Sequence, residues 1–139
     1  MGADATTIVL EAEASQVAPA RRFVRRMLAS STDPATLSDL QLIVSELFTN
    51  AVEHGVDGTV RVVVHDLPDF VGVTVQSRGP APDVGETSEW QVAAPTAISG
   101  RGLGIVRELA DEVVVERIGD DLVVTARRAT HDRTPCTAD

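Results

Sequence analysis

Two pairs of valine-rich segments constrain the fold of this chain most strongly. The first pair is TVRVVVH, starting at Thr59, and FVGVTV, starting at Phe70, joined by a turn through residues 67–69. The second pair is EVVVERI and LVVTARR, joined by residues 119–121. β-Branched residues at this density favour strands, and a short polar connection between two strands favours a hairpin. These segments therefore predict a sheet.

Three segments with helical periodicity are expected in addition to these strands. Apolar residues recur at helical spacing in ARRFVRRML, with arginines between them. Asp33 is placed to cap a second helix, with Pro34 in its first turn and Gly55 at its end. A third, short helix is expected from about Leu103 to Ala110. The segment TTIVLEAE, before the first helix, alternates as a strand does.

The resulting order is strand, helix, helix, strand, strand, helix, strand, strand. It predicts the α+β class, as a two-layer α/β sandwich with helices on one face of a mixed, mostly antiparallel sheet. A length of 139 residues suits one domain, expected over residues 1–128, with a flexible tail at 129–139. Residues 79–99 contain three prolines and no periodic pattern, which is typical of a lid or a binding loop.

Charge and hydrophobicity exclude some partners. The formal net charge of -9 argues against broad electrostatic binding to nucleic acid or to anionic lipid. No apolar run approaches the roughly 20 residues that span a bilayer, so we expect no membrane association. A single cysteine, Cys136, agrees with a reducing compartment. A cytoplasmic location is therefore expected, and an anionic ligand would have to be held by local geometry.

The segment SELFTNAVEHG carries three polar residues at four-residue spacing. Glu46, Asn50 and His54 fall on one side of the second helix, beside its apolar face. One interpretation is structural: the acid and the amide are solvated, and the histidine caps or packs. The other is a functional site at the edge of the core.

The segment SGRGLG gives the functional interpretation its main support. Gly100, Gly102 and Gly104 lie immediately before the third helix, where bare backbone amides and the helix N-terminus could bind phosphate. A flexible hinge is the alternative. However, a phosphate-binding turn, an amide able to bind Mg²⁺ and a carboxylate able to act as a base are together the components of a phosphoryl-transfer site.

These motifs, with GPAP after a strand, resemble those of the GHKL (histidine kinase-like) ATPase superfamily. They resemble more closely the bacterial anti-sigma-factor serine/threonine kinases of the small actinobacterial type. The resemblance implies ATP and Mg²⁺ as cofactors, with Glu46 as the general base on a protein hydroxyl and Asn50 as the metal ligand. Residues 79–99 would form the ATP lid. The other implied cofactor-binding residues are Ser77, Gly79, Gly100, Arg101, Gly102, Leu103 and Gly104.

Ser77 departs from the family pattern. The family has an aspartate two residues before the first-box glycine, here Gly79, and this aspartate accepts a hydrogen bond from the adenine amino group. A serine hydroxyl can also accept such a bond but carries no charge. Replacing a charge-assisted bond by a neutral one costs on the order of 1–2 kcal/mol, or about ten- to thirtyfold in affinity.

Two functions follow from the resemblance. The first is an ATP-binding anti-sigma factor that phosphorylates a STAS-type anti-anti-sigma protein on serine or threonine. The alternative is a degenerate binding module that sequesters its partner without productive use of ATP. A histidine-kinase catalytic domain is disfavoured, because the sequence shows no dimerisation helices with a phospho-accepting histidine.

The implied partners are a sigma factor, the STAS-type protein and a second copy of the chain. A surface for such contacts is expected on the first helix, which concentrates positive charge on an otherwise acidic protein; arginines that only solvate the helix are the alternative. The residues concerned are Arg21, Arg22, Arg25 and Arg26.

Overall fold

The computed structural model describes residues 5–54, 58–78 and 100–129, with no account of the side chains of residues 5, 54 and 100–103. The strands are β1 (Ala5–Glu11), β2 (Thr59–Asp66), β3 (Phe70–Arg78), β4 (Glu112–Ile118) and β5 (Asp121–Ala129). The helices are α1 (Val17–Leu28), α2 (Pro34–His54) and α4 (Gly100–Leu109), with a short 3-10 turn, η1 (Ala14–Gln16), before α1.

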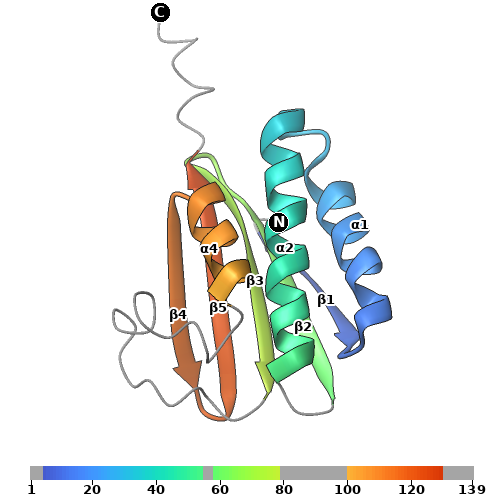
Figure 1. Ribbon diagram of the computed structural model, residues 1–139. Helices are drawn as coiled ribbons and strands as arrows, with labels where there is room; N and C mark the ends of the chain where they lie inside the picture. The colour runs from blue at the N-terminus through green and yellow to red at the C-terminus, as the bar shows by residue number, and fades with distance from the viewer. Residues whose placement is uncertain (1–4, 55–57, 79–99, 130–139) are drawn as a thin grey trace, which may run out of the picture.

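The strands form one five-stranded sheet in the order β1-β2-β3-β5-β4. All four strand pairings are antiparallel. The helices α1, α2 and α4 lie side by side on one face, and α2 contacts both of the others (Figure 1). The predicted fold class, a two-layer α/β sandwich with helices on one face, is confirmed.

The local signals place most elements correctly. The Asp33 carboxylate accepts a hydrogen bond from the Thr36 amide at 3.1 Å, so it caps α2 as predicted, and Pro34 begins that helix. Gly119 adopts a φ of +62° in the two-residue turn between β4 and β5, a conformation that favours glycine. The predicted helix end at Gly55 lies outside the described residues.

The third helix begins earlier than predicted. It starts at Gly100 instead of about Leu103, so Gly100 and Gly102 lie in its first turn, Gly104 follows that turn, and none of them precedes the helix. The sequence suggested a later start because glycine is a poor helix former. Tertiary packing of α4 against α2 overrides this weak local preference.

The core lies between the helices and the inner face of the sheet. Alternate residues of β2 and β3 are buried there, and α2 covers them with Phe48, which is fully buried. Burying a side chain of this kind contributes about 1.5–3 kcal/mol. The largest fully buried side chains are Phe48, Leu28, Leu40, Ile43, Val24, Val44, Val60, Val62, Val71, Val73 and Val106.

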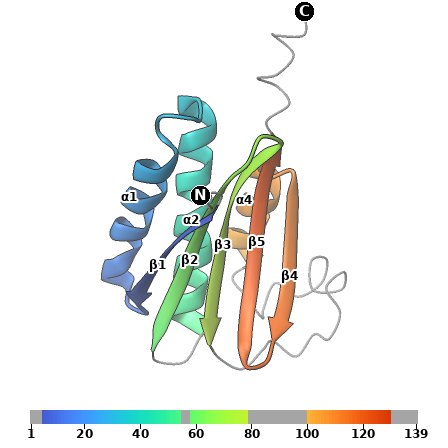
Figure 2. The same cartoon turned by 180° about the vertical axis from the view of Figure 1, so that it is seen from behind.

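The outer face of the sheet is not covered by a helix (Figure 2). Polar side chains bond to one another across its strands: the Thr74 hydroxyl lies 2.8 Å from Nε2 of His65 and 2.8 Å from the Thr125 hydroxyl. Arg127 pairs with Glu112 at 3.6 Å. We call this surface the open face.

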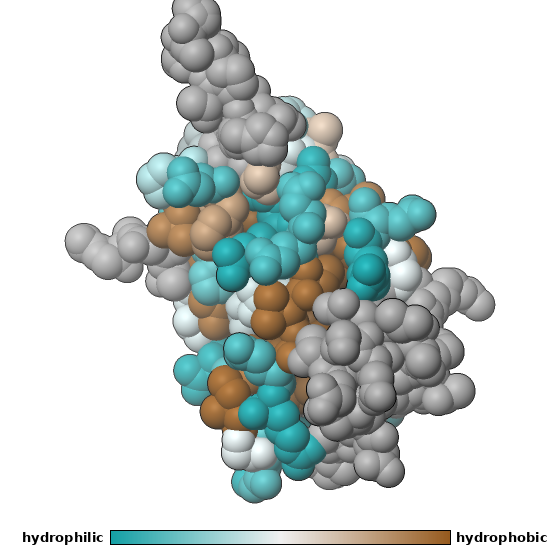
Figure 3. Space-filling view, turned by 90° about the vertical axis from the view of Figure 1, so that its left-hand side faces the viewer, coloured by the Kyte–Doolittle hydropathy of each residue, from teal (hydrophilic) through white to brown (hydrophobic). Residues whose placement is uncertain are grey.

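Some apolar surface remains exposed. Ile118, at the end of β4, is 57% exposed, and the side of the molecule that carries β4 shows apolar areas bordered by hydrophilic ones (Figure 3). Within the described ranges, no helix is long and apolar enough to cross a membrane.

Candidate functional site

The candidate site lies at one end of the helical layer. The last turns of α2, the first turn of α4 and the end of β3 are all found at this end of the molecule (Figure 1). Because α2 packs against both α4 and β3, side chains from separate parts of the chain are held near one another. The predicted residues Glu46, Asn50, Ser77 and Gly104 all belong to these elements.

Asn50 is the most informative residue of the site. It is only 6% exposed, and its side-chain Nδ2 is buried with no hydrogen-bond partner in the described part of the chain. A buried polar group without a partner costs about 1–3 kcal/mol. An amide can turn either its nitrogen or its oxygen towards a ligand, so it can donate to an anion or bind a cation. Asn50 is therefore the residue of this site that most needs an explanation.

Glu46 lies one helical turn before Asn50 and is half-buried. At this spacing the two side chains fall on the same side of α2. A carboxylate so placed is accessible to a hydroxyl that approaches from outside the helical layer. His54 completes the predicted stripe, but the position of its side chain is not described.

Ser77 lies on the inner face of the sheet, at the end of β3. Its neighbours across the sheet are Val60 and Leu122, and it is 8% exposed. A buried hydroxyl at this position is on the same face of the sheet as α2. The contact of Ser77 with a nucleotide base stays a prediction.

Gly104 is an exposed glycine with open space beside it. It lies within α4, and a Cβ atom added to it would meet no heavy atom within 4 Å. An alanine would therefore fit and would favour the helix by about 0.5–1 kcal/mol. Close approach of a ligand to the backbone would explain why this position has glycine instead of alanine.

The remaining predicted positions cannot be described at the level of side chains. Gly100 and Gly102 lie in the first turn of α4, as do Arg101 and Leu103. Gly79 lies outside the described residues. The first turn of a helix presents backbone N–H groups without intrahelical partners, and such groups together with the helix dipole favour phosphate.

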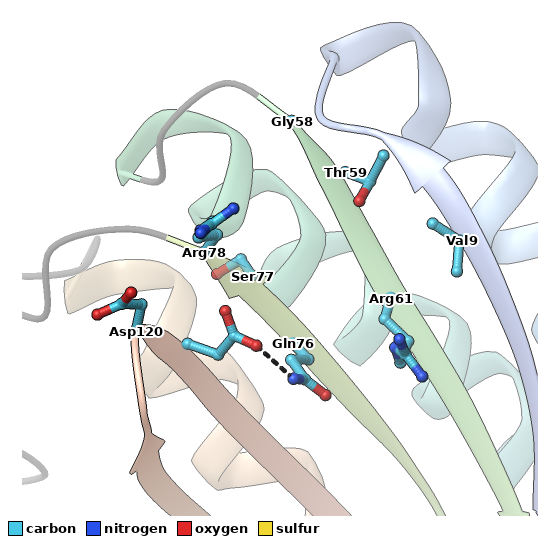
Figure 4. A pocket seen from close by; sticks show the side chains of 9 residues that line it. Val9, Gly58, Thr59, Arg61, Gln76, Ser77, Arg78 and Asp120 are labelled. Carbon is cyan, nitrogen blue, oxygen red and sulfur yellow. Dashed lines mark hydrogen bonds between the residues drawn. The ribbon is translucent and has the colours of Figure 1, made fainter.

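A cavity of about 500 Å³ opens at this end of the sheet. Several side chains that line it come from the open face, and Gln76 donates a hydrogen bond to Asp121 across it at 2.7 Å (Figure 4). The lining residues are Val9, Gly58, Thr59, Arg61, Gln76, Ser77, Arg78, Asp120 and Asp121. The sequence did not indicate this cavity, because strand alternation assigns a residue to a face but does not show where neighbouring strands leave a hollow.

The described chain is thus a two-layer sandwich, in which antiparallel strands are covered on one face by three helices and a buried asparagine lies on the helix that packs against the glycine-containing α4. The chain matches the histidine kinase-like ATPase domain over residues 10–128 and belongs to that family.

Similarity among solved structures agrees with this fold. The crystal structure of the RsbU and RsbW domains of Rv1364c from Mycobacterium tuberculosis matches with a TM-score of 0.67 and 22% identity. The match covers 90% of this chain and 32% of that one, so the chain spans about a third of that structure's length. No curated protein matches the sequence.

The residues present fit a magnesium–nucleotide complex. Asn50, whose amide nitrogen has no partner among the described residues, lies on α2, and the exposed Gly104 lies on α4, which packs against α2. Amide oxygens are suitable ligands for Mg²⁺, and the first turn of a helix is suitable for phosphate oxygens.

Proposed function

We propose that this protein binds ATP with Mg²⁺ and transfers the terminal phosphoryl group to a serine or threonine of a STAS-type anti-anti-sigma protein. It would act as an anti-sigma factor when that protein is absent. Membership in the histidine kinase-like ATPase family supports nucleotide binding. The observation that carries the proposal is the buried Asn50 on the helix that packs against α4, with an amide nitrogen that has no partner in the described part of the chain.

Each residue has a defined part in this reaction. Asn50 would bind Mg²⁺ through its amide oxygen, and the first turn of α4 would bind the phosphates through its backbone N–H groups. Glu46 would accept the proton of the attacking hydroxyl on a carboxylate oxygen. The bound magnesium–nucleotide complex supplies a phosphoryl group whose negative charge is neutralised by the metal. The protein contributes mainly position and electrostatics.

Partner binding is proposed at α1. Its arginines are all exposed, and none of them forms an ion pair within the described ranges. On a chain with net charge -9, this concentration of unpaired positive charge suits an acidic partner surface. The solved structure with the same fold contains an RsbW domain, which is consistent with sigma-factor and anti-anti-sigma partners. Homodimerisation and a cytoplasmic location remain part of the proposal.

A binding module without catalysis is the second candidate. Ser77 favours it, because a neutral, buried hydroxyl stands where a charged acceptor is expected. Affinity for ATP would then be too weak for turnover, and partner capture would be the function.

A nucleotide titration separates these candidates. Trp90 is the only tryptophan and lies in the predicted lid, so its fluorescence should change as Mg-ATP is added, with calorimetry as confirmation. Phosphate transfer to purified STAS proteins then tests catalysis. Mg-ATP binding followed by phosphate transfer supports the kinase. Absence of phosphate transfer supports the binding module, whether or not Mg-ATP binds. If neither fluorescence nor calorimetry detects Mg-ATP, nucleotide binding is contradicted.

Glu46→Gln tests the general base. It should leave Mg-ATP affinity unchanged and lower phosphate transfer by about 10²–10⁴-fold, because only the proton acceptor is removed. Glu116→Gln is the matched control, since Glu116 is an exposed acid on β4, at the open face, and should keep full activity. Equal transfer by the two variants would remove Glu46 from the mechanism.

The α1 surface has its own test. Replacing Arg21 and Arg22 by Glu should weaken capture of the sigma factor or the STAS protein, measured by calorimetry, while circular dichroism shows an intact fold. An unchanged affinity would exclude α1 from the interface.

A further inference from the structure

Arg128 connects three elements at the end of the molecule opposite the candidate site. It is the penultimate residue of β5 and projects into the helical layer, where its Nη1 lies 2.5 Å from the Asp39 carboxylate. The same nitrogen donates to the carbonyl of Leu109 at 3.1 Å, and Nη2 lies 3.5 Å from the Thr36 hydroxyl. One side chain thus joins the sheet to the first half of α2 and to the last residue of α4.

The contact with Leu109 is favourable for general reasons. The last carbonyls of a helix have no intrahelical donor, and the end of the helix carries partial negative charge. A guanidinium group donates a hydrogen bond to such a carbonyl and places positive charge at the negative end of the helix. Its rigid array of donors can bind Asp39 at the same time. Because Arg128 and Asp39 are only 23% and 33% exposed at their side chains, solvent screens this pair less than a surface pair.

A second set of hydrogen bonds at this end joins the residues after α4 to the sheet. Asp111 donates its amide to the Arg127 carbonyl at 2.8 Å, and its carboxylate accepts from the Ala129 amide at 2.7 Å. Both bonds hold the residues after α4 to β5. Arg128 adds a polar link from the end of α4 to α2.

The two helices joined by Arg128 carry the two halves of the candidate site. The first turn of α4 contains two of the three predicted glycines, and α2 contains Glu46 and Asn50. A ten-residue helix is about 15 Å long, so a tilt of about 4° at the Arg128 end moves the glycine end by about 1 Å. A displacement of 1 Å at reacting groups can cost about 10²-fold in rate.

We propose that Arg128 is a positioning residue that sets the distance between the phosphate-binding turn of α4 and Asn50. It does so from the far end of α4, by holding Leu109 against Asp39 of α2. The proposal rests on the proposed nucleotide function of these two helices. Arg128 itself touches neither nucleotide nor substrate.

Arg127 provides a matched control within the same strand. It is adjacent in sequence but projects to the open face, where it pairs with Glu112 at 3.6 Å and lies 4.7 Å from the ring centre of Phe70. Arg127→Met and Arg128→Met each remove one half-buried arginine and one ion pair from β5. Only the second breaks a link between the helices.

The experiment compares these two variants with the wild type in Mg-ATP affinity and in amide hydrogen exchange of α4 without nucleotide. Arg128→Met should weaken affinity by about tenfold or more and speed exchange across residues 100–109, whereas Arg127→Met should change neither. Arg128→Lys should recover part of the affinity, because an ammonium group can reach one of the two acceptors. Should Arg128→Met fail to fold, Asp39→Asn, which weakens the same link, is expected to show the same two effects to a smaller extent.

The outcomes separate the two proposals. Failure of the wild type to bind Mg-ATP would overturn the nucleotide function and the positioning role with it. Binding by the wild type, with Arg128→Met or Asp39→Asn indistinguishable from Arg127→Met in affinity and exchange, would overturn the positioning role alone.

Discussion

The two faces of the sheet differ in whether a buried polar side chain has a hydrogen-bond partner. On the open face, Thr74 is 8% exposed and its hydroxyl bonds to both His65 and Thr125. In the helical layer, Asn50 is 6% exposed and its amide nitrogen has no partner among the described residues. Since native proteins satisfy nearly all buried polar groups, the bonds of Thr74 are explained by the structure, and the unpaired nitrogen of Asn50 is a reason to place the proposed ligand beside it.

The largest effect is expected from exchanging these two polar groups for apolar ones. Asn50→Leu should leave the free energy of unfolding unchanged or raise it by up to about 1 kcal/mol, because it removes an unpaired group. The same change should weaken Mg-ATP binding by about 100-fold or more, since it removes the proposed metal ligand. Thermal unfolding and calorimetry measure the two quantities.

Thr74→Val is the counterpart on the open face. It preserves the shape of the side chain but leaves His65 and Thr125 without their bonds, so the protein should lose about 1–3 kcal/mol of stability. Mg-ATP affinity should not change. Asn50→Leu could instead destabilise the protein as Thr74→Val does and keep the wild-type affinity for Mg-ATP. That result would contradict the inference that Asn50 serves a ligand and Thr74 serves the fold.

Two glycines sharpen the same contrast. A Cβ added to Gly72 would lie 2.5 Å from the Ala126 carbonyl oxygen on the neighbouring strand, whereas one added to Gly104 meets open space. Gly72→Ala should therefore cost about 1–3 kcal/mol with affinity unchanged. Gly104→Ala should stabilise the protein by about 0.5–1 kcal/mol and weaken Mg-ATP binding by about tenfold, the equivalent of about 1.4 kcal/mol.

Denaturant unfolding gives the stability of each glycine variant, and nucleotide titration gives its Mg-ATP affinity. Opposite signs for stability and affinity at Gly104 would support a ligand against its backbone. A stabilised Gly104→Ala with wild-type affinity would mean that no ligand approaches this turn.

The sequence predicts the framework of the molecule better than its polar contacts. Valine density and helical spacing identified the strands and helices, because these patterns depend only on residues close together in the sequence. Asp33 was identified as a cap for the same reason. The bond between Arg128 and Asp39 joins residues 89 positions apart, and no local pattern indicates it.

The candidate site shows the same division. Glu46 and Asn50 could be placed on one side of a helix from their spacing alone. The burial of Asn50 without a partner could not, because it depends on how α2 packs in the folded chain. The start of α4 at Gly100 was missed because glycine has a low intrinsic helix propensity, which the packing of α4 against α2 overrides.

The smallest effect concerns pH and the open face. Burial, and secondarily the positive charge of Arg127, lower the pKa of His65 below its ordinary value of 6.5. The unfolded chain then binds a proton more readily than the folded one between the lowered pKa and 6.5. The free energy of unfolding should therefore be highest above pH 6.5 and should fall as the pH decreases through this window.

His65→Gln should remove this dependence, because glutamine does not titrate. Arg127→Met should reduce it without abolishing it, since burial is the larger cause and remains. Melting temperatures of the three proteins at pH 7.5 and pH 5.5 measure the effect, and Mg-ATP affinity should be the same for His65→Gln and the wild type at pH 7.5. A His65→Gln variant that loses as much stability on acidification as the wild type would place the titrating group elsewhere, and a loss of nucleotide affinity would show that the open face is not independent of the site.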